Sequence, residues 1–185
     1  MKKLLYILSL VSILAACEND MSEVNRLFST EETKVETAIG VEMLYSDSAI
    51  LNLRIVTPKM VRHIADKDPW QEFPNGLEIE FFDKTGEKVT GRMTANYAER
   101  YDKESKFIVR DSVVWFGEKG EKLETEELIW EEANDKVHTN KFVVVSRPDE
   151  IIYGHGFDSN KDFTKWRIRA IEGRIKSNVA KDLKD

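Results

Sequence analysis

Residues 86–115, GEKVTGRMTANYAERYDKESKFIVRDSVVW, give the clearest indication of the fold. Residues 120–146, GEKLETEELIWEEANDKVHTNKFVVVS, repeat their pattern about 30 to 34 residues later. Each copy opens on Gly-Glu-Lys and an apolar residue, continues to an aromatic residue, Tyr97 or Trp130, and ends in a run rich in valine. An echo at this spacing is typical of a stacked unit, here a hairpin of two or more short strands. One unit cannot bury its apolar face alone. Stacking therefore predicts an elongated sheet with open edges at both ends, where strands of another chain can add.

Short apolar runs predict the other strands, and clusters of Gly, Asn, Asp and Lys between them predict turns. No stretch after residue 17 keeps a helical spacing of apolar residues over three turns, and prolines limit the best helical candidate, residues 57–65. The fold class that these patterns predict is all-β. The predicted strands are 77–81, 93–97, 107–109, 113–116, Val137 with 142–145, and 166–170, and the predicted turns are 83–86, 101–104, 117–120, 133–136 and 154–159.

Alternation along the predicted strands places one set of apolar side chains on a common face. Such a set either forms an ordinary core or lines a groove, and for any residue taken singly the core is the more common explanation. The set is Leu77, Ile79, Phe81, Met93, Ala95, Tyr97, Phe107, Val109, Val113, Trp115, Leu128 and Trp130.

The first residues predict export and lipidation. Lys2 and Lys3 precede an apolar run of 13 residues, 4–16, which has the length of a signal peptide and is shorter than the roughly 20 residues that span a bilayer. The run ends in Leu-Ala-Ala followed by Cys17, which resembles the lipobox of bacterial lipoproteins. We therefore expect a signal peptide at 1–16 and a lipid anchor on Cys17. The alternative is an ordinary secretory signal that leaves a free thiol.

Composition divides the remaining chain and excludes several classes of partner. Residues 17–38 are polar and predict a tether, residues 39–176 predict the folded domain, and residues 177–185 predict a disordered tail.

The formal net charge is -6 and the basic residues are dispersed, so we expect no nucleic-acid partner. The three histidines lack a metal-ligand spacing, and no catalytic arrangement of carboxylates, nucleophile or Gly-rich loop is found. The sequence therefore predicts neither an enzyme nor a cofactor or metal.

Residues 40–176 resemble the LptC family of lipopolysaccharide-export proteins, in the form where a lipobox replaces the transmembrane anchor. The matching segments are 45–47, 57–60, 73–83, 94–98, 122–130, Thr139, 154–156 and 162–163. The chain departs from the shortest family members in a longer stretch at 59–73.

The resemblance implies an open, twisted β-jellyroll of stacked short antiparallel strands, of the OstA/LptA-like type. Its apolar interior would receive the acyl chains of lipopolysaccharide from an inner-membrane ABC transporter, and its far end would pass them to a periplasmic LptA-like bridge protein by strand pairing. The chain would then be periplasmic and anchored to a membrane, most simply the inner one. Contact with the bridge protein would fall at the C-terminal edge, for which the candidates are Gly154, Gly156, Phe163, Trp166 and Ile168. Gly154 and Gly156 indicate a close backbone approach or a bulge at that edge, and an ordinary turn is equally consistent with them.

Two other functions are weighed beside this one. A lipid-anchored β-barrel or sandwich that binds a small apolar ligand or a protein predicts a closed cavity and no pairing at strand edges. An exported enzyme such as a glycosidase requires a convergent pair of carboxylates, which the sequence does not indicate.

Overall fold

The computed structural model of the chain describes residues 34–64 and 66–176. The predicted signal peptide at 1–16, the predicted lipidation site Cys17 and the predicted tail at 177–185 lie outside that range. Within it the strands form one antiparallel sheet with a twisted, jellyroll-like arrangement, which confirms the predicted fold class. No helix among the described residues is long and apolar enough to cross a bilayer. The strands are β1 (Val35–Asp47), β2 (Ile50–His63), β3 (Trp70–Phe73), β4 (Leu77–Phe82), β5 (Val89–Ala95), β6 (Tyr97–Tyr101), β7 (Lys106–Gly117), β8 (Lys122–Glu131), β9 (Lys136–Ser146), β10 (Glu150–Asn160) and β11 (Trp166–Lys176), and a short 3₁₀ turn, η2 (Glu132–Asn134), precedes β9.

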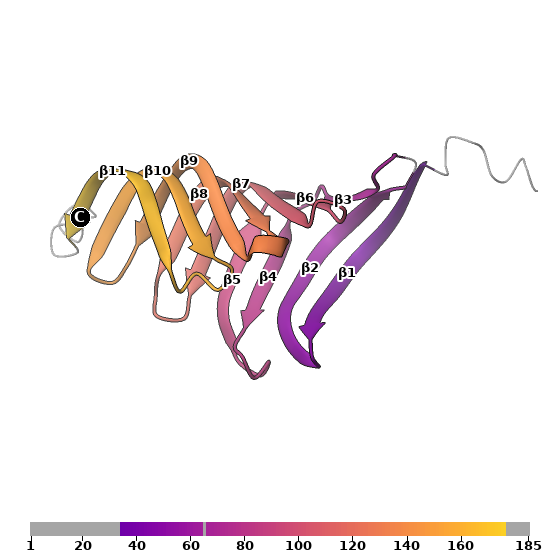
Figure 1. Cartoon of the computed structure of the whole chain (residues 1–185), viewed down its shortest axis with the longest axis horizontal. Helices are drawn as coiled ribbons and strands as arrows, with labels where there is room; N and C mark the ends of the chain where they lie inside the picture. Colours follow the sequence, from indigo (N-terminus) through magenta and orange to yellow (C-terminus); the bar gives the residue numbers. More distant parts are fainter. Residues whose placement is uncertain (1–33, 65, 177–185) are drawn as a thin grey trace, which may run out of the picture. The chain divides into compact units, whose positions relative to one another are not determined.

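The sheet is a meander of bent strands that follow one another in sequence order from β1 to β11 (Figure 1). β3 and β4 act as one bent strand joined by residues 74–76, and β5 and β6 act as another joined by Asn96. β2 pairs with both β3 and β4, and β7 pairs with both β5 and β6. Within the described part of the chain, β1 and β11 each pair with one strand only, so each leaves one edge open.

The two similar sequence segments, 86–115 and 120–146, form two equivalent hairpins of this meander. Gly86 lies in the turn before β5 and Gly120 in the turn before β8, and both have left-handed backbones, with φ of 75° and 81°. The bent strand β5–β6 then corresponds to β8, and β7 corresponds to β9. Stacking of hairpins is therefore confirmed as the principle of the fold.

A crease crosses the sheet where the strands bend. Gly76, Asp111, Ser112 and Gly156 lie on it and have φ between 56° and 77°, a left-handed conformation that interrupts the pleat. The backbone N–H of Asn96 donates to the carbonyl oxygen of Asp111 at 2.9 Å and bridges two bent strands at the crease.

The crease divides the sheet into two layers that face each other. We name them the β4 layer, which contains β4, β5 and the halves of the long strands that continue alongside them, and the β6 layer, which contains β3, β6 and the other halves. Apolar side chains from both layers form one core. Its buried members are Leu53, Ile55, Phe73, Leu77, Ile79, Met93, Ala95, Ala98, Phe107, Val109, Val113, Trp115, Leu123, Leu128, Val137, Val143, Val145, Ile152, Phe157, Phe163 and Ile168.

Three local predictions differ from the structure. The candidate helix at 57–65 is wrong, because residues 57–63 belong to β2; Pro58, which has no N–H to donate, falls at the crease, where the ladder with β1 skips a position. The turn expected at 154–159 is also wrong, because the segment lies within β10. The alternative expectation of a bulge is confirmed at Gly156, where the register with β9 shifts. Residues 35–38, assigned to the tether by composition, already belong to β1.

Candidate functional site

The candidate site is a partly enclosed apolar pocket between the two layers, with a volume of about 180 Å³. The β4 layer contributes Ile79 and Phe81, and the β6 layer contributes Phe107 and Leu128 from the opposite side. The pocket therefore lies at the interface of the layers. Its complete lining is Tyr45, Ser46, Asn52, Leu53, Ile55, Ile79, Phe81, Phe82, Met93, Arg100, Phe107, Val109, Leu128, Trp130, Glu132, Val137, Lys161, Asp162 and Phe163.

Eleven of the twelve residues predicted from alternation face this interior. Leu77, Ala95, Val113 and Trp115 belong to the core and do not line the pocket. The other inward residues line the pocket itself: Ile79, Phe81, Met93, Phe107, Val109, Leu128 and Trp130.

Tyr97 is the exception, and its predicted position in the groove is wrong. The crease at Asn96 breaks the alternation, so that Ala98, with no exposed surface, takes the inward position. The Tyr97 hydroxyl lies 3.1 Å from carboxylate oxygens of both Glu72 and Glu99, to one of which it donates. Burial, together with these two carboxylates, raises the pKa of Tyr97 well above its ordinary value.

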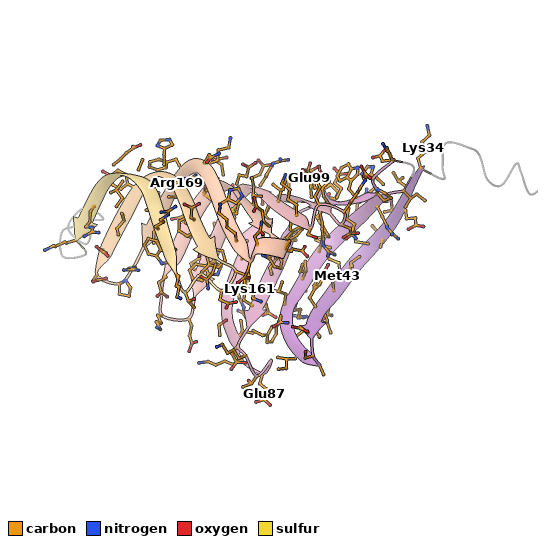
Figure 2. The ribbon with its side chains drawn as sticks, viewed as in Figure 1. Lys34, Met43, Glu87, Glu99, Lys161 and Arg169 are labelled. Atoms are coloured by element: carbon orange, nitrogen blue, oxygen red, sulfur yellow. The ribbon has the colours of Figure 1, made fainter. Side chains whose placement is uncertain are left out.

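A polar bridge joins the two layers at one end of the pocket. The Arg100 guanidinium of β6 donates to the Tyr45 hydroxyl of β1 at 2.7 Å and to the Glu132 carboxylate at 3.3 Å. It also lies over the Tyr45 ring, 5.0 Å from the ring centroid, at a distance where a cation and an aromatic face attract. Burial raises the pKa of Tyr45, with Glu132 adding to the effect and Arg100 opposing it. Met43, two residues before Tyr45 on the inward side of β1, is labelled in Figure 2 and marks the position of this strand.

Phe163 lines another part of the pocket. The sequence predicted it at the C-terminal edge of the sheet, but the structure places its ring in the interior. It lies in the loop between β10 and β11, yet its side chain is only 5% exposed and belongs to the core. Its ring stacks on Trp115, with centroids 4.5 Å apart, and meets the Phe81 ring edge-on at 5.8 Å. Hydrogen bonds from Phe163 and Lys165 to Asn160, the last residue of β10, hold the short loop closed, and the Phe163 ring fills the interior.

The other C-terminal candidates lie on the last two strands, as expected for that edge. Gly154 and Gly156 are in β10, and Trp166 and Ile168 are in β11. A Cβ at Gly154 would overlap the carbonyl oxygen of Ala170, so the close approach of β10 and β11 requires glycine there.

Sequence reasoning missed one wall and one end of the pocket. Leu53 and Ile55 come from β2, which was not among the predicted strands, although the alternation at 51–57 is a signal that could have identified it. No sequence pattern indicated that Arg100 and Glu132 would meet Tyr45, because the three come from distant parts of the chain.

Many charged side chains elsewhere in the described residues form ion pairs or small networks, such as Arg54 with Glu42 and Glu80. Each histidine contacts a single glutamate: His63 with Glu72, His138 with Glu131, and His155 with Glu172. No group of three or more metal-ligating side chains is found in the ranges that the structure covers.

Comparison of the chain with protein-family models and with curated proteins gives no significant match.

Proposed function

We propose that this chain is a non-enzymatic lipopolysaccharide-transport protein that shields acyl chains from water between the two layers of its sheet. The observation that carries the proposal is the apolar pocket at the layer interface, in a sheet whose first and last described strands each leave an edge open. The resemblance to the LptC family supports the same function.

The energetics favour shielding over catalysis as the task of such a pocket. An acyl chain of a dozen methylenes costs on the order of 10 kcal/mol to expose to water, at about 0.8 kcal/mol for each methylene. Movement between equivalent apolar surfaces costs little by comparison. The protein then needs to offer only an apolar path, and an ATPase in the membrane supplies the work.

The open edges provide the means of handover in this proposal. A sheet edge presents unpaired N–H and C=O groups to which a strand of another protein can add. The β1 edge would face the inner-membrane ABC transporter, and the β11 edge would pair with the periplasmic LptA-like bridge protein. The lipid on Cys17 would hold the protein at the periplasmic surface of the inner membrane.

Depletion of the protein in its host tests the transport function. We expect lipopolysaccharide to accumulate at the inner membrane as the protein is lost. Unchanged lipopolysaccharide at the cell surface after depletion would overturn the proposal.

Photocrosslinking tests the route that the lipid takes. A photoreactive residue at Phe81 or Leu128, which line the pocket, is expected to form lipid adducts. Tyr97 is the matched control, because its side chain lies outside the pocket and is held by Glu72 and Glu99. Adducts at Tyr97 equal to those at Phe81 would contradict passage between the layers.

A second crosslinking pair tests the C-terminal edge. Ile171 on the edge strand β11 is 57% exposed, and Phe116 on the internal strand β7 is 51% exposed. A photoreactive residue at Ile171 is expected to capture the bridge protein, identified by mass spectrometry, whereas the same residue at Phe116 is not.

One observation favours a second function, the binding of a single small apolar ligand. The volume of about 180 Å³ is on the order of the ~150 Å³ engineered cavities that bind benzene. A binding module of this kind would leave the edges unused, so it predicts no capture at Ile171 and unchanged lipopolysaccharide after depletion.

A further inference from the structure

The pocket occupies only part of the interior between the layers, and Phe163 lies at one of its boundaries. Phe163 lines the pocket on one side of its ring and contacts Trp115 and Phe157 with the rest, at centroid distances of 4.5 and 6.4 Å. Neither Trp115 nor Phe157 lines the pocket. The ring therefore separates the pocket from the part of the interior that lies nearer β11.

Beyond Phe163 the aromatic contacts continue to the last strand. Phe157 stacks on Trp166 of β11 at 5.9 Å, and the Arg147 guanidinium lies 4.6 Å from the centroid of the Trp166 ring. A row of ring faces thus leads from the pocket toward the C-terminal edge. Phe157 and Ile168 are buried members of the core on this side of Phe163, and neither lines the pocket.

The loop that carries Phe163 is held by the last residue of β10, Asn160. Asn160 supplies most of the bonds: its backbone carbonyl accepts from the N–H of Phe163 at 3.1 Å, and its side-chain oxygen accepts from the N–H of Lys165 at 2.9 Å. The Asn160 amide nitrogen also donates to the Thr164 hydroxyl at 2.8 Å. These bonds fix the backbone of the loop to the end of β10, while the Phe163 ring itself is held by apolar and aromatic contacts only. Figure 2 labels Lys161, at the start of this loop.

The backbone of Phe163 is itself unusual. Its φ is 53°, in the left-handed region that side chains other than glycine occupy at an energetic cost. Packing of the ring compensates for that conformation, so the loop geometry and the burial of the ring depend on each other.

We propose that Phe163 is the specificity-determining residue of the pocket, and that its ring sets how long a segment of a single unbranched alkyl chain the pocket accepts. This inference rests on the proposed function in one respect, that the pocket receives alkyl chains. A chain that reaches the ring gains no more from added methylenes, because the extra carbons remain in water. Removal of the ring adds the volume that the ring occupies, beside Trp115, to the pocket.

The test measures the dissociation constants of the full chain for straight-chain carboxylates from hexanoate to hexadecanoate by calorimetry, below their micelle concentrations. Each methylene that enters an apolar site strengthens binding about fourfold, which corresponds to about 0.8 kcal/mol. We expect the affinity of the wild-type chain to rise with length and then to become constant. In Phe163→Ala the rise continues for at least two further methylenes, which gives about tenfold or greater gain for the longest carboxylates.

Two further variants keep the test decisive. Phe116→Ala removes the same ring from an exposed position on β7, and its plateau is expected at the wild-type length. Phe163→Leu, which keeps an apolar filling, is expected to move the plateau by less than Phe163→Ala and serves if the alanine variant does not fold.

The outcomes separate this inference from the proposed function. A plateau at the same chain length in wild type and in both Phe163 variants overturns the role of Phe163 and leaves transport untouched. Absence of carboxylate binding in the wild-type chain overturns both this inference and the shielding of acyl chains in the pocket.

Discussion

Thr57 is a buried polar residue at the crease, where strand-to-strand hydrogen bonds are interrupted. Its side chain is only 1% exposed, and its hydroxyl lies 2.8 Å from the carbonyl oxygen of Gly76 and 2.9 Å from that of Lys59, so it donates to one of them at a time. The hydroxyl thus satisfies a carbonyl group that the bend removes from the ladder.

We predict that Thr57→Val lowers the free energy of unfolding by about 1–3 kcal/mol, because the substitution keeps the shape and leaves a buried carbonyl without a donor. Denaturant unfolding measures the change. Thr125→Val is the control: its hydroxyl donates to the Phe142 carbonyl at 2.8 Å in an exposed setting, where water replaces the bond. An equal loss in the two variants would contradict the role of burial.

Asp83 organises the turn between β4 and β5. Its Oδ1 accepts from the Thr85 hydroxyl at 2.7 Å and from the backbone N–H groups of Thr85, Glu87 and Lys88 at 3.1 to 3.4 Å. The bond from the Thr85 hydroxyl is the largest cause of the lowered pKa of the Asp83 carboxyl; desolvation opposes it and the backbone bonds add to it.

A lowered pKa in the folded state means that the unfolded chain binds more protons as the pH falls. The Asp83 carboxylate therefore stabilises the fold above its unfolded pKa of about 3.9, and this contribution is lost as the pH falls through the lower folded value. We predict that Asp83→Asn lowers the melting temperature at neutral pH and that the difference from wild type shrinks below about pH 4. Glu87→Gln is the control, since only the backbone of Glu87 joins the turn; a difference that stays constant with pH in Asp83→Asn would refute the prediction.

At the scale of single residues, the sequence predicts which side chains turn inward wherever alternation is unbroken, as along Leu77, Ile79 and Phe81. The prediction fails at Tyr97 because one residue at a bend reverses the two faces. It also cannot place Phe163 in the core, because a loop has no period from which a direction could be inferred.

At the scale of elements, the bend between β3 and β4 depends on Gly76. Its φ is 77°, and a Cβ there would lie 2.7 Å from the carbonyl oxygen of Ala95 and 3.2 Å from the Cα of Asn96. Gly120, in the turn between β7 and β8, has a similar φ of 81°, but a Cβ there would find its nearest neighbour, Pro148, at 3.7 Å.

A side chain at these glycines has two costs, the left-handed backbone and the overlap of its Cβ with neighbouring atoms, and the two positions allow these costs to be measured separately. We predict that Gly120→Ala costs about 1–2 kcal/mol of unfolding free energy, from the left-handed backbone alone. Gly76→Ala is expected to cost more than Gly120→Ala, because its Cβ also contacts backbone atoms that cannot move aside. Chemical denaturation of both variants measures the two values, and equal costs would show that crowding at the crease is unimportant.

Several elements could be predicted because their apolar runs and turn residues are local signals, as at β4, β5 and the turns at 83–86 and 117–120. The start of β1 and the second half of β2 could not, since residues 35–38 have the polar composition of a tether and residues 57–63, with Pro58, resemble a short helix. Whether these segments form strands depends on their pairing with neighbouring strands in the sheet. The residue pattern of one segment taken alone carries no information about that pairing.

At the scale of the whole molecule, each internal strand is supported from both sides and each terminal strand from one side. In such a stack, stability is approximately a sum of contributions from each strand and its neighbours. We predict that amide hydrogen exchange is slowest in β7 and β8 and becomes faster toward β1 and toward β11. Exchange measured by mass spectrometry on the intact chain tests this, and uniform protection across all strands would contradict it.

The pocket as a whole was less predictable than the sheet. Alternation predicts an apolar face, but it does not distinguish a filled core from an open pocket, because that difference is set by how the two layers pack. The seven predicted residues that line the pocket could be identified from the two-residue alternation of apolar side chains along the strands. The polar bridge of Tyr45, Arg100 and Glu132 is formed only by the tertiary fold and could not.

The meander also has an evolutionary consequence. Since each bent strand lies between its neighbours in sequence, duplication or deletion of one hairpin-encoding segment, such as 86–115, would lengthen or shorten the two-layered sheet without changing any other strand pairing. The length of the sheet in proteins of this architecture is thus expected to vary in steps of one hairpin, so homologues of different size should differ by whole multiples of that unit.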